Sequence, residues 1–301
     1  MNSQTGQIRV NEHRIINNAV TIQVREYAGA GDTVIFLHFS GANLMMWQPA
    51  LPHFQGRYRV LLPDLRGHGK SSLPDAGYHM DDMAEDIIEV LHHLGIQKAH
   101  VVGSSLGAEV GLSMAANHPD KILSLTCEGA LYSEYGPYGI WQGTEQQFNA
   151  HVAARLEKTR NTPESMYPSI DELVADRRKV YEGSGMWNEY IEAMVRYGVR
   201  EVKDGKYCKS WGKNASEDYT RNYFSCRFED YYRRIQCPIL MLPDEDMMNG
   251  GPEKEAMIGL QQIAAHCEVT AIPGWSHPYG WLLTPELACP TVLNFLAKAT
   301  S

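Results

Sequence analysis

The sequence predicts an α/β protein built on a doubly wound, mostly parallel β-sheet, with a helical segment inserted into it. Two observations lead to this class. Between residues 20 and 130, short apolar runs of strand length alternate with helical patterns, as parallel strands joined by helical crossovers do. The alternation stops near residue 131 and resumes near residue 235, so the sheet is interrupted by the insertion and completed after it.

The first part of the chain contains five segments with strand character. "TIQVREY" (21–27) alternates apolar and polar residues with a period of two. "TVIFLH" (33–38), "RVLLPD" (59–64) and "KAHVVGS" (98–104) are continuous apolar runs, which is typical of strands buried on both faces. "KILSLTCEG" (121–129) is a further strand-like run.

Helical patterns separate the last three of these runs. In "DDMAEDIIEVLHHLG" (81–95), apolar residues recur at helical spacing, acids crowd the first turn, and Gly95 stands where a C-terminal cap would. "AEVGLSMAANHPD" (108–120) is a small-residue helix that Pro119 ends. Both are predicted to be right-handed crossovers of the parallel sheet.

The segment 131–234 has a different character. It is rich in Tyr, Trp and charge, it shows several helical patterns, and it has no strand-like runs. After it, "CPILMLPDEDMM" (237–248) and "EVTAIPGWSH" (268–277) resume the strand pattern, and "TPELACPTVLNFLAKA" (284–299) closes the chain as a helix. We therefore predict a core formed by residues 1–130 and 235–301 and a helical insertion at 131–234.

Composition excludes several classes of partner. The net charge of −9 has no compensating basic stretch, which argues against nucleic acid and anionic membranes. No apolar run approaches the ~18 residues of a membrane span, and the start has no leader pattern, so we expect a cytoplasmic protein. The six cysteines lack C-x-x-C spacing, and we expect no metal, no cofactor and no disulfide framework; no feature specifies an oligomeric state.

The stretch "GSSLG" (103–107) carries the first catalytic candidate. A match to G-x-S-x-G is common by chance, but here it lies between a buried strand and a small-residue helix, where a tight turn exposes a hydroxyl over the sheet edge. Ser105 is therefore the predicted nucleophile, and Ser104 is a packing neighbour. A serine needs a base, and His277 in "PGWSHPYG" follows the last strand-like run, so we predict that it is this base.

Four stretches in this order resemble the α/β-hydrolase superfamily: "FLHFSG" with Trp47 following, "PDLRGHGKSS", "GSSLG", and "PILMLPDED" ahead of "IPGWSHP". The resemblance covers residues 20–130 and 235–300. It implies that the insertion is a cap over the active site. It also implies an oxyanion hole formed by the backbone amides of Ser40 and Leu106. The family usually has His-Gly where this chain has His38-Phe39, so Phe39 is the alternative donor.

Three carboxylates are candidates for the acid that holds the base. The family usually places it a few residues past the strand "PILML", which favours Asp246, with Asp244 as an alternative. Some members place it after the strand that follows the nucleophile, which makes Glu128 the other alternative. Each would fix the tautomer of His277 and stabilise its charged form.

The resemblance implies a serine hydrolase that acts on an ester or lactone of a small to medium, partly apolar organic molecule. Aromatic residues are the candidates for contacts with this substrate: Phe39, Trp141, Tyr138, Trp187 and Trp211. A carbon–carbon bond hydrolase uses the same triad, but commonly has Trp directly after the base, where this chain has Pro278. A ligand-sensing protein on a hydrolase scaffold is the alternative from another class; the intact Ser, His and acid set favours an enzyme.

Overall fold

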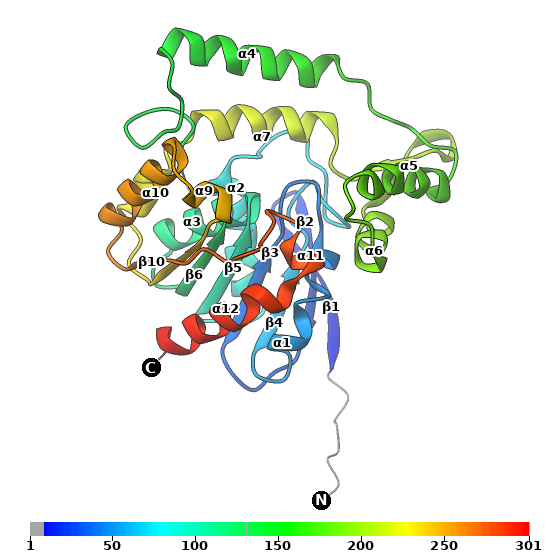
Figure 1. Ribbon diagram of the computed structural model, residues 1–301. Helices are drawn as coiled ribbons and strands as arrows, with labels where there is room; N and C mark the ends of the chain where they lie inside the picture. Colours follow the sequence, from blue (N-terminus) through cyan, green and yellow to red (C-terminus); the bar gives the residue numbers. More distant parts are fainter. Residues whose placement is uncertain (1–8, 130–131, 301) are drawn as a thin grey trace, which may run out of the picture.

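The computed structural model describes residues 9–129 and 132–300, and an eight-stranded β-sheet forms its centre (Figure 1). The chain start at residues 1–8 and the predicted boundary at 130–131 lie outside the described residues. In spatial order the strands are β1 (Val10–Asn17), β2 (Val20–Tyr27), β4 (Arg59–Pro63), β3 (Thr33–Leu37), β5 (Ala99–Ser104), β6 (Ile122–Glu128), β9 (Ile239–Leu242) and β10 (Cys267–Val269).

Most neighbouring strands in this sheet are parallel. The exceptions are β1, which pairs antiparallel with β2, and β2, which pairs antiparallel with β4. All pairs from β4 to β10 are parallel, which confirms the predicted class. β1 was not predicted from the sequence, because most of its residues are polar and one is buried.

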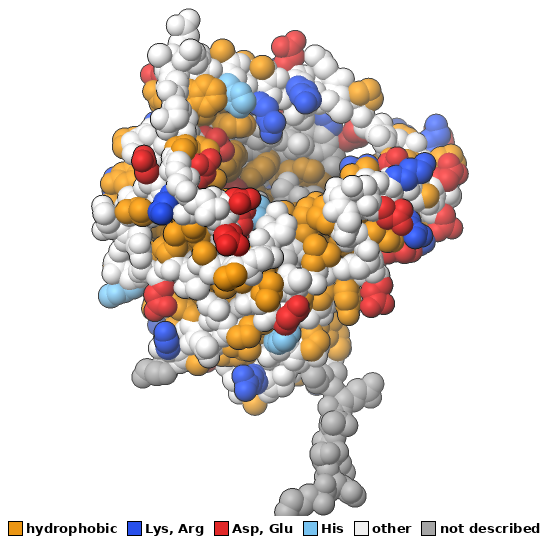
Figure 2. Space-filling model, viewed as in Figure 1, with side chains coloured by type: hydrophobic (Ala, Val, Ile, Leu, Met, Phe, Trp, Pro, Cys, Tyr) orange, Lys and Arg blue, Asp and Glu red, His pale blue; other side chains and the backbone are white. Residues whose placement is uncertain are grey.

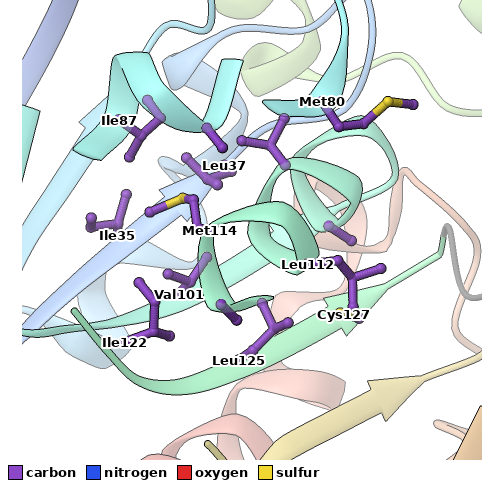
Figure 3. Packing of buried hydrophobic residues seen from close by; sticks show 14 of the residues in the cluster. Ile35, Leu37, Met80, Ile87, Val101, Leu112, Met114, Ile122, Leu125 and Cys127 are labelled. Atoms are coloured by element: carbon purple, nitrogen blue, oxygen red, sulfur yellow. The ribbon is translucent and has the colours of Figure 1, made fainter. Parts of the chain in front are cut away.

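The sheet is buried on both faces. Successive residues of a strand point to opposite sides, and in the central strands both sets of side chains lie in apolar clusters. In β3, Ile35 and Leu37 join one apolar cluster, and Val34 and Phe36 join the other. In Figure 3, which shows residues of the first cluster, Ile35 of β3 and Leu125 of β6 lie on either side of Val101 of β5, the strand between them. This two-sided burial explains why these strands are continuous apolar runs in the sequence.

Helices cover both faces of the sheet. The first cluster is covered by α2 (Met80–His93), α3 (Leu106–Asn117), α8 (Phe228–Tyr232) and α10 (Pro252–Ile263). The second is covered by η1 (Leu44–Trp47), α1 (Leu51–Phe54), α11 (Gly280–Leu283) and α12 (Pro285–Ala299). The predicted crossover helices correspond to α2 and α3, so the doubly wound arrangement is confirmed.

The insertion contributes four longer helices and a small hairpin. These elements are α4 (Glu145–Asn161), α5 (Ile170–Gly183), α6 (Glu189–Tyr197), α7 (Lys213–Ser225), the short helix η2 (Lys203–Gly205), and strands β7 (Val199–Glu201) and β8 (Tyr207–Lys209). In Figure 1, α4 and α7 extend above the sheet and α5 and α6 lie to one side. The hairpin was missed in the sequence because each strand has only three residues.

The helix α8 corrects one predicted boundary. Residues up to 234 were assigned to the insertion, but Phe228 and Tyr232 of α8 are fully buried in the first core cluster. The separate part of the insertion therefore ends before α8. Among the helices of the described ranges, none has the length and apolar character needed to cross a membrane.

Buried polar contacts fix the loop that follows β4. The Arg66 guanidinium donates two hydrogen bonds to Asp86, at 2.6 and 2.8 Å, inside the fold. The Asp64 carboxylate accepts hydrogen bonds from the backbone amides of Leu44 and Lys70 and from the Tyr197 hydroxyl. These residues of "PDLRGHG" tie together the loop beside the end of β3, where the candidate site lies.

Candidate active site

Ser105 lies in the sharp turn between β5 and α3. Its backbone angles, φ 49° and ψ −118°, are ones that residues with side chains rarely adopt. The turn needs small neighbours: a Cβ on Gly103 would lie 2.4 Å from the Gly107 carbonyl oxygen, and a Cβ on Gly107 would lie 2.0 Å from the Leu37 carbonyl oxygen. The structure therefore holds Ser105 in a strained turn at the carboxyl end of the sheet, as the motif predicts.

The backbone of this turn is anchored to the next strand. The Ser105 amide donates a hydrogen bond of 2.6 Å to the carbonyl oxygen of Glu128 at the end of β6. Within the described part of the chain, the Ser105 hydroxyl makes no hydrogen bond. Hydrogen bonds between catalytic groups often tighten only when substrate is bound.

His277 is held by Glu128. Its Nδ1 lies 2.6 Å from Oε1 of Glu128, whose side chain is only 1% exposed, whereas the His277 ring remains 24% exposed. Burial alone lowers the pKa of His277, but the hydrogen bond and negative charge of Glu128 outweigh it, and the pKa lies above its usual 6.5. Since Glu128 binds Nδ1, the other ring nitrogen is left to accept a proton.

Three further side chains donate hydrogen bonds to the Glu128 carboxylate. The Ser104 hydroxyl reaches Oε2 at 2.5 Å, and the indole N–H groups of Trp275 and Trp281 reach Oε1 and Oε2 at 3.2 and 3.3 Å. Ser104 is thus a partner of the acid and not only a packing residue. Sequence reasoning missed both tryptophans, although they flank His277 within four residues.

The structure corrects the preferred choice of acid. Asp246 is exposed on the short helix α9 (Glu245–Met248) and makes no hydrogen bond to His277. Asp244 is the N-cap of α9, and its carboxylate accepts the backbone amide of Met247 at 3.0 Å. The turn after β9 therefore uses its acids to begin a helix, and the carboxylate at His277 is Glu128, the alternative at the end of β6.

Two neutral histidines shape the loop that follows β3. His38 Nδ1 lies 2.9 Å from the Phe39 carbonyl oxygen and its Nε2 accepts the Leu65 amide, while His68 Nε2 accepts the Gly41 amide. Burial lowers the pKa of His38 to about 4 and lowers that of His68 well below 6.5. Both rings are therefore uncharged at neutral pH and act as fixed donors and acceptors for the loop.

This arrangement orients the amide of Ser40. The Phe39 carbonyl accepts hydrogen bonds from His38 and from the Ala42 amide, so it points into the loop. In a trans peptide the following N–H points the opposite way, which directs the Ser40 amide away from these groups. Among the described residues, neither the Ser40 amide nor that of Leu106, the first residue of α3, donates a hydrogen bond.

A cavity of about 220 Å³ adjoins this loop. Phe39 and Trp211, two of the aromatic residues proposed for substrate contacts, line it. Trp141 and Tyr138 pack elsewhere: the Trp141 ring lies 5.6 Å from that of Phe148, and Tyr138 lies against Gly259 of α10. The Trp187 ring packs on Tyr181 behind the cavity wall, at 6.2 Å. Figure 2 shows the surface hollowed between the insertion and the core.

A buried acid, Glu109, was not singled out in the sequence. It lies four residues after Ser105 on α3, and its carboxylate accepts the hydroxyl of Tyr219 from α7 at 2.9 Å. Burial raises the pKa of Glu109 to about 8. The signal available in the sequence was a single acid in a helix of mostly apolar and small residues. Glu109 therefore links the helix after the nucleophile to the insertion.

Known proteins share this fold over most of the chain. The family described as alpha/beta hydrolase fold matches residues 32–249. The 2-(acetamidomethylene)succinate hydrolase of Mesorhizobium japonicum is 24% identical to this chain over 94% of both chains. A crystal structure of E-2-(acetamidomethylene)succinate hydrolase superposes on it with a TM-score of 0.75 at 23% identity, covering 96% of this chain and 100% of the other. The 3-oxoadipate enol-lactonase 2 of Acinetobacter baylyi is 34% identical, over 43% of this chain and 48% of its own.

The family match extends from the start of β3 past the end of β9, so it contains the turn at Ser105 and the acid Glu128. His277 follows beyond its limit, on the loop after β10. The sheet order, the strained serine turn and the match over residues 32–249 together show that this chain belongs to the alpha/beta hydrolase fold family.

Proposed function

We propose that this protein is a serine hydrolase that cleaves an ester or lactone of a small to medium, partly apolar organic molecule. One observation carries the proposal: Glu128 joins both halves of the site. Its carbonyl oxygen holds the Ser105 backbone and its carboxylate holds His277. A nucleophile in a strained turn, a base and a buried acid are the parts that acyl transfer requires.

The reaction proceeds in two steps. His277 takes the hydroxyl proton as Ser105 attacks the carbonyl carbon, and then donates that proton to the leaving alcohol. The amides of Ser40 and Leu106 stabilise the negative oxygen that forms, each contributing on the order of 10² to 10³ in rate. Water then attacks the acyl-enzyme with His277 again as base, which releases the acid and restores Ser105.

The relatives support this reaction class. One of them is named as a lactonase and another as a hydrolase of 2-(acetamidomethylene)succinate, and a lactone is a cyclic ester. The insertion serves as a cap: α5 and α6 supply part of the wall of the cavity beside the oxyanion loop. The Phe39 and Trp211 rings in the same wall suit an apolar part of the substrate.

Reaction with a fluorophosphonate probe tests the proposal directly. We expect covalent modification at Ser105, identified by mass spectrometry of the labelled peptide, and no modification in Ser105→Ala. A control on the same helix, Ser113→Ala, should retain labelling, because Ser113 lies eight residues further along α3 and its hydroxyl donates a hydrogen bond to Asp81. A folded wild-type protein that does not react would favour a ligand-sensing protein over an enzyme.

The pH dependence of kcat/KM should reveal the base. His277 acts while uncharged, so activity falls as pH decreases through its pKa, and this pKa is raised above 6.5. We therefore expect the acidic limb of the profile for a neutral aryl ester to have its midpoint above pH 6.5. A midpoint well below pH 6 would argue against His277 as the group that must lose its proton.

A further inference from the structure

The cavity beside the oxyanion loop is also lined by a residue of the loop that carries His277. Phe39, Ser40 and Gly41 form one wall, and Tyr279, two residues after His277, forms another. The rings of Phe39 and Tyr279 are 5.5 Å apart, in an edge-to-face arrangement. A group bound in this cavity therefore lies beside the position that the carbonyl of a substrate would occupy.

Two charged residues line the cavity, and both are basic. Leu173, Arg177 and Tyr181 repeat every four residues, so they form one face of α5 toward the cavity, and Lys209 reaches it from β8. No Asp or Glu of the described ranges lines it. This is unexpected in a chain whose net charge is −9.

Arg177 has donors that the fold does not use. One terminal nitrogen lies 3.2 Å from the carboxylate of Asp176, but Nε is buried and has no hydrogen-bond partner among the described residues. A buried donor without a partner is costly, so a site that retains one favours an incoming acceptor. Lys209 adds to this positive charge: burial and the nearby Arg177 cation lower its pKa, and the negative charge of Asp176 offsets this only in part.

Ser210 offers a third donor in the same wall. Its side chain is buried, and its oxygen accepts the Gly69 amide at 3.1 Å. The hydroxyl proton is not donated to any group of the described chain. A guanidinium, an ammonium and a hydroxyl therefore face one small cavity, whose other walls are largely apolar and aromatic apart from Ser40 and Asn43.

We infer that this cavity binds a carboxylate of the substrate, with Arg177 as its main partner and Lys209 and Ser210 as supporting donors. The inference rests on the proposed function and narrows its substrate to esters or lactones with a free carboxylate a few carbon atoms from the scissile carbonyl. At about 220 Å³ the cavity is smaller than the ~300–1,000 Å³ of typical ligand pockets, so it accommodates one end of a small molecule. The planar guanidinium suits a carboxylate, and the apolar walls suit the short carbon chain that carries it.

A pair of synthetic esters tests the inference. The mono-(4-nitrophenyl) ester of adipic acid carries a carboxylate, and the primary amide of the same ester is neutral with nearly the same shape. We expect wild-type protein to favour the anion in kcat/KM, and Arg177→Gln to reduce this preference about 10- to 100-fold, as expected for a hydrogen bond to a charged group. Lys179→Gln removes an exposed positive charge from the same helix and should leave the preference unchanged.

Binding without chemistry separates this inference from the proposed function. In the Ser105→Ala background, isothermal titration with adipate should give binding that Arg177→Gln weakens about 10- to 100-fold and Lys179→Gln does not. If neither ester reacts but adipate binds through Arg177, the carboxylate site is supported and ester hydrolysis is not. If the neutral ester reacts without preference for the anion, or adipate binds equally to Arg177→Gln, the carboxylate site is wrong. Tighter binding of inorganic phosphate than of adipate would also overturn it.

Discussion

Replacing Glu128 by Gln is expected to lower kcat about 10³- to 10⁴-fold. The Gln amide has nearly the same shape as the carboxylate, but its NH₂ group cannot accept a hydrogen bond from Nδ1 of His277. In the wild-type protein this nitrogen lies 2.6 Å from Oε1 of Glu128. The ring then favours the tautomer that carries its proton on the wrong nitrogen, and the charged ring in the transition state loses its counter-ion. The loss is therefore one of chemistry more than of substrate binding.

Matched variants at the other two acids sharpen this test. Asp246→Asn, at an exposed position, should retain activity within about twofold, and Asp244→Asn should do the same apart from a small loss of helix capping. Initial rates on a neutral aryl ester, with circular dichroism to verify folding, provide the measurement. In Glu128→Gln the acidic limb of the kcat/KM profile should also move to lower pH. Burial lowers the pKa of His277, and in this variant the negative charge of Glu128 no longer raises it. A large loss in Asp246→Asn with an active Glu128→Gln would reverse the assignment.

The parts of the site that depend on local sequence could be predicted. A turn as strained as that at Ser105 requires small residues at 103 and 107, and this requirement is visible as G-x-S-x-G after an apolar run. His277 could be found for a similar reason, since it follows the last strand on a loop rich in Gly and Pro. The central strands were equally clear, because burial on both faces produces continuous apolar runs.

The acid could not be decided from the sequence, because its choice depends on contacts between distant segments. Glu128 and His277 are 149 residues apart, and both β6 and β9 end with carboxylates nearby. What separates the candidates is the short helix after β9, which Asp244 caps and on which Asp246 is exposed. Three of the predicted aromatic residues, Trp141, Tyr138 and Trp187, do not line the cavity for a related reason: the packing of the insertion, and not the residue type, decides which rings face it.

Replacing Gly107 by Ala should damage both stability and activity. A Cβ there would lie 2.0 Å from the carbonyl oxygen of Leu37 and 2.4 Å from its carbonyl carbon, and these are backbone atoms that no rotamer change can move. The first turn of α3 would have to shift away from β3, at a cost of about 3 kcal/mol, the upper part of the usual range for overpacking. We expect the melting temperature to fall by roughly 5–10 °C.

The same shift should impair catalysis in the molecules that still fold. Leu106, whose amide is a proposed oxyanion donor, precedes Gly107, and a displacement of about 1 Å can reduce the rate on the order of 100-fold. Gly183→Ala is the matched control, because its Cβ would meet no atom within 4 Å and its position at the end of α5 tolerates a side chain. Thermal melts and kcat/KM measured on both variants separate the two effects. A Gly107→Ala protein with wild-type stability and activity would show that α3 does not pack against the end of β3, and the geometry proposed for the oxyanion hole would then have to be abandoned.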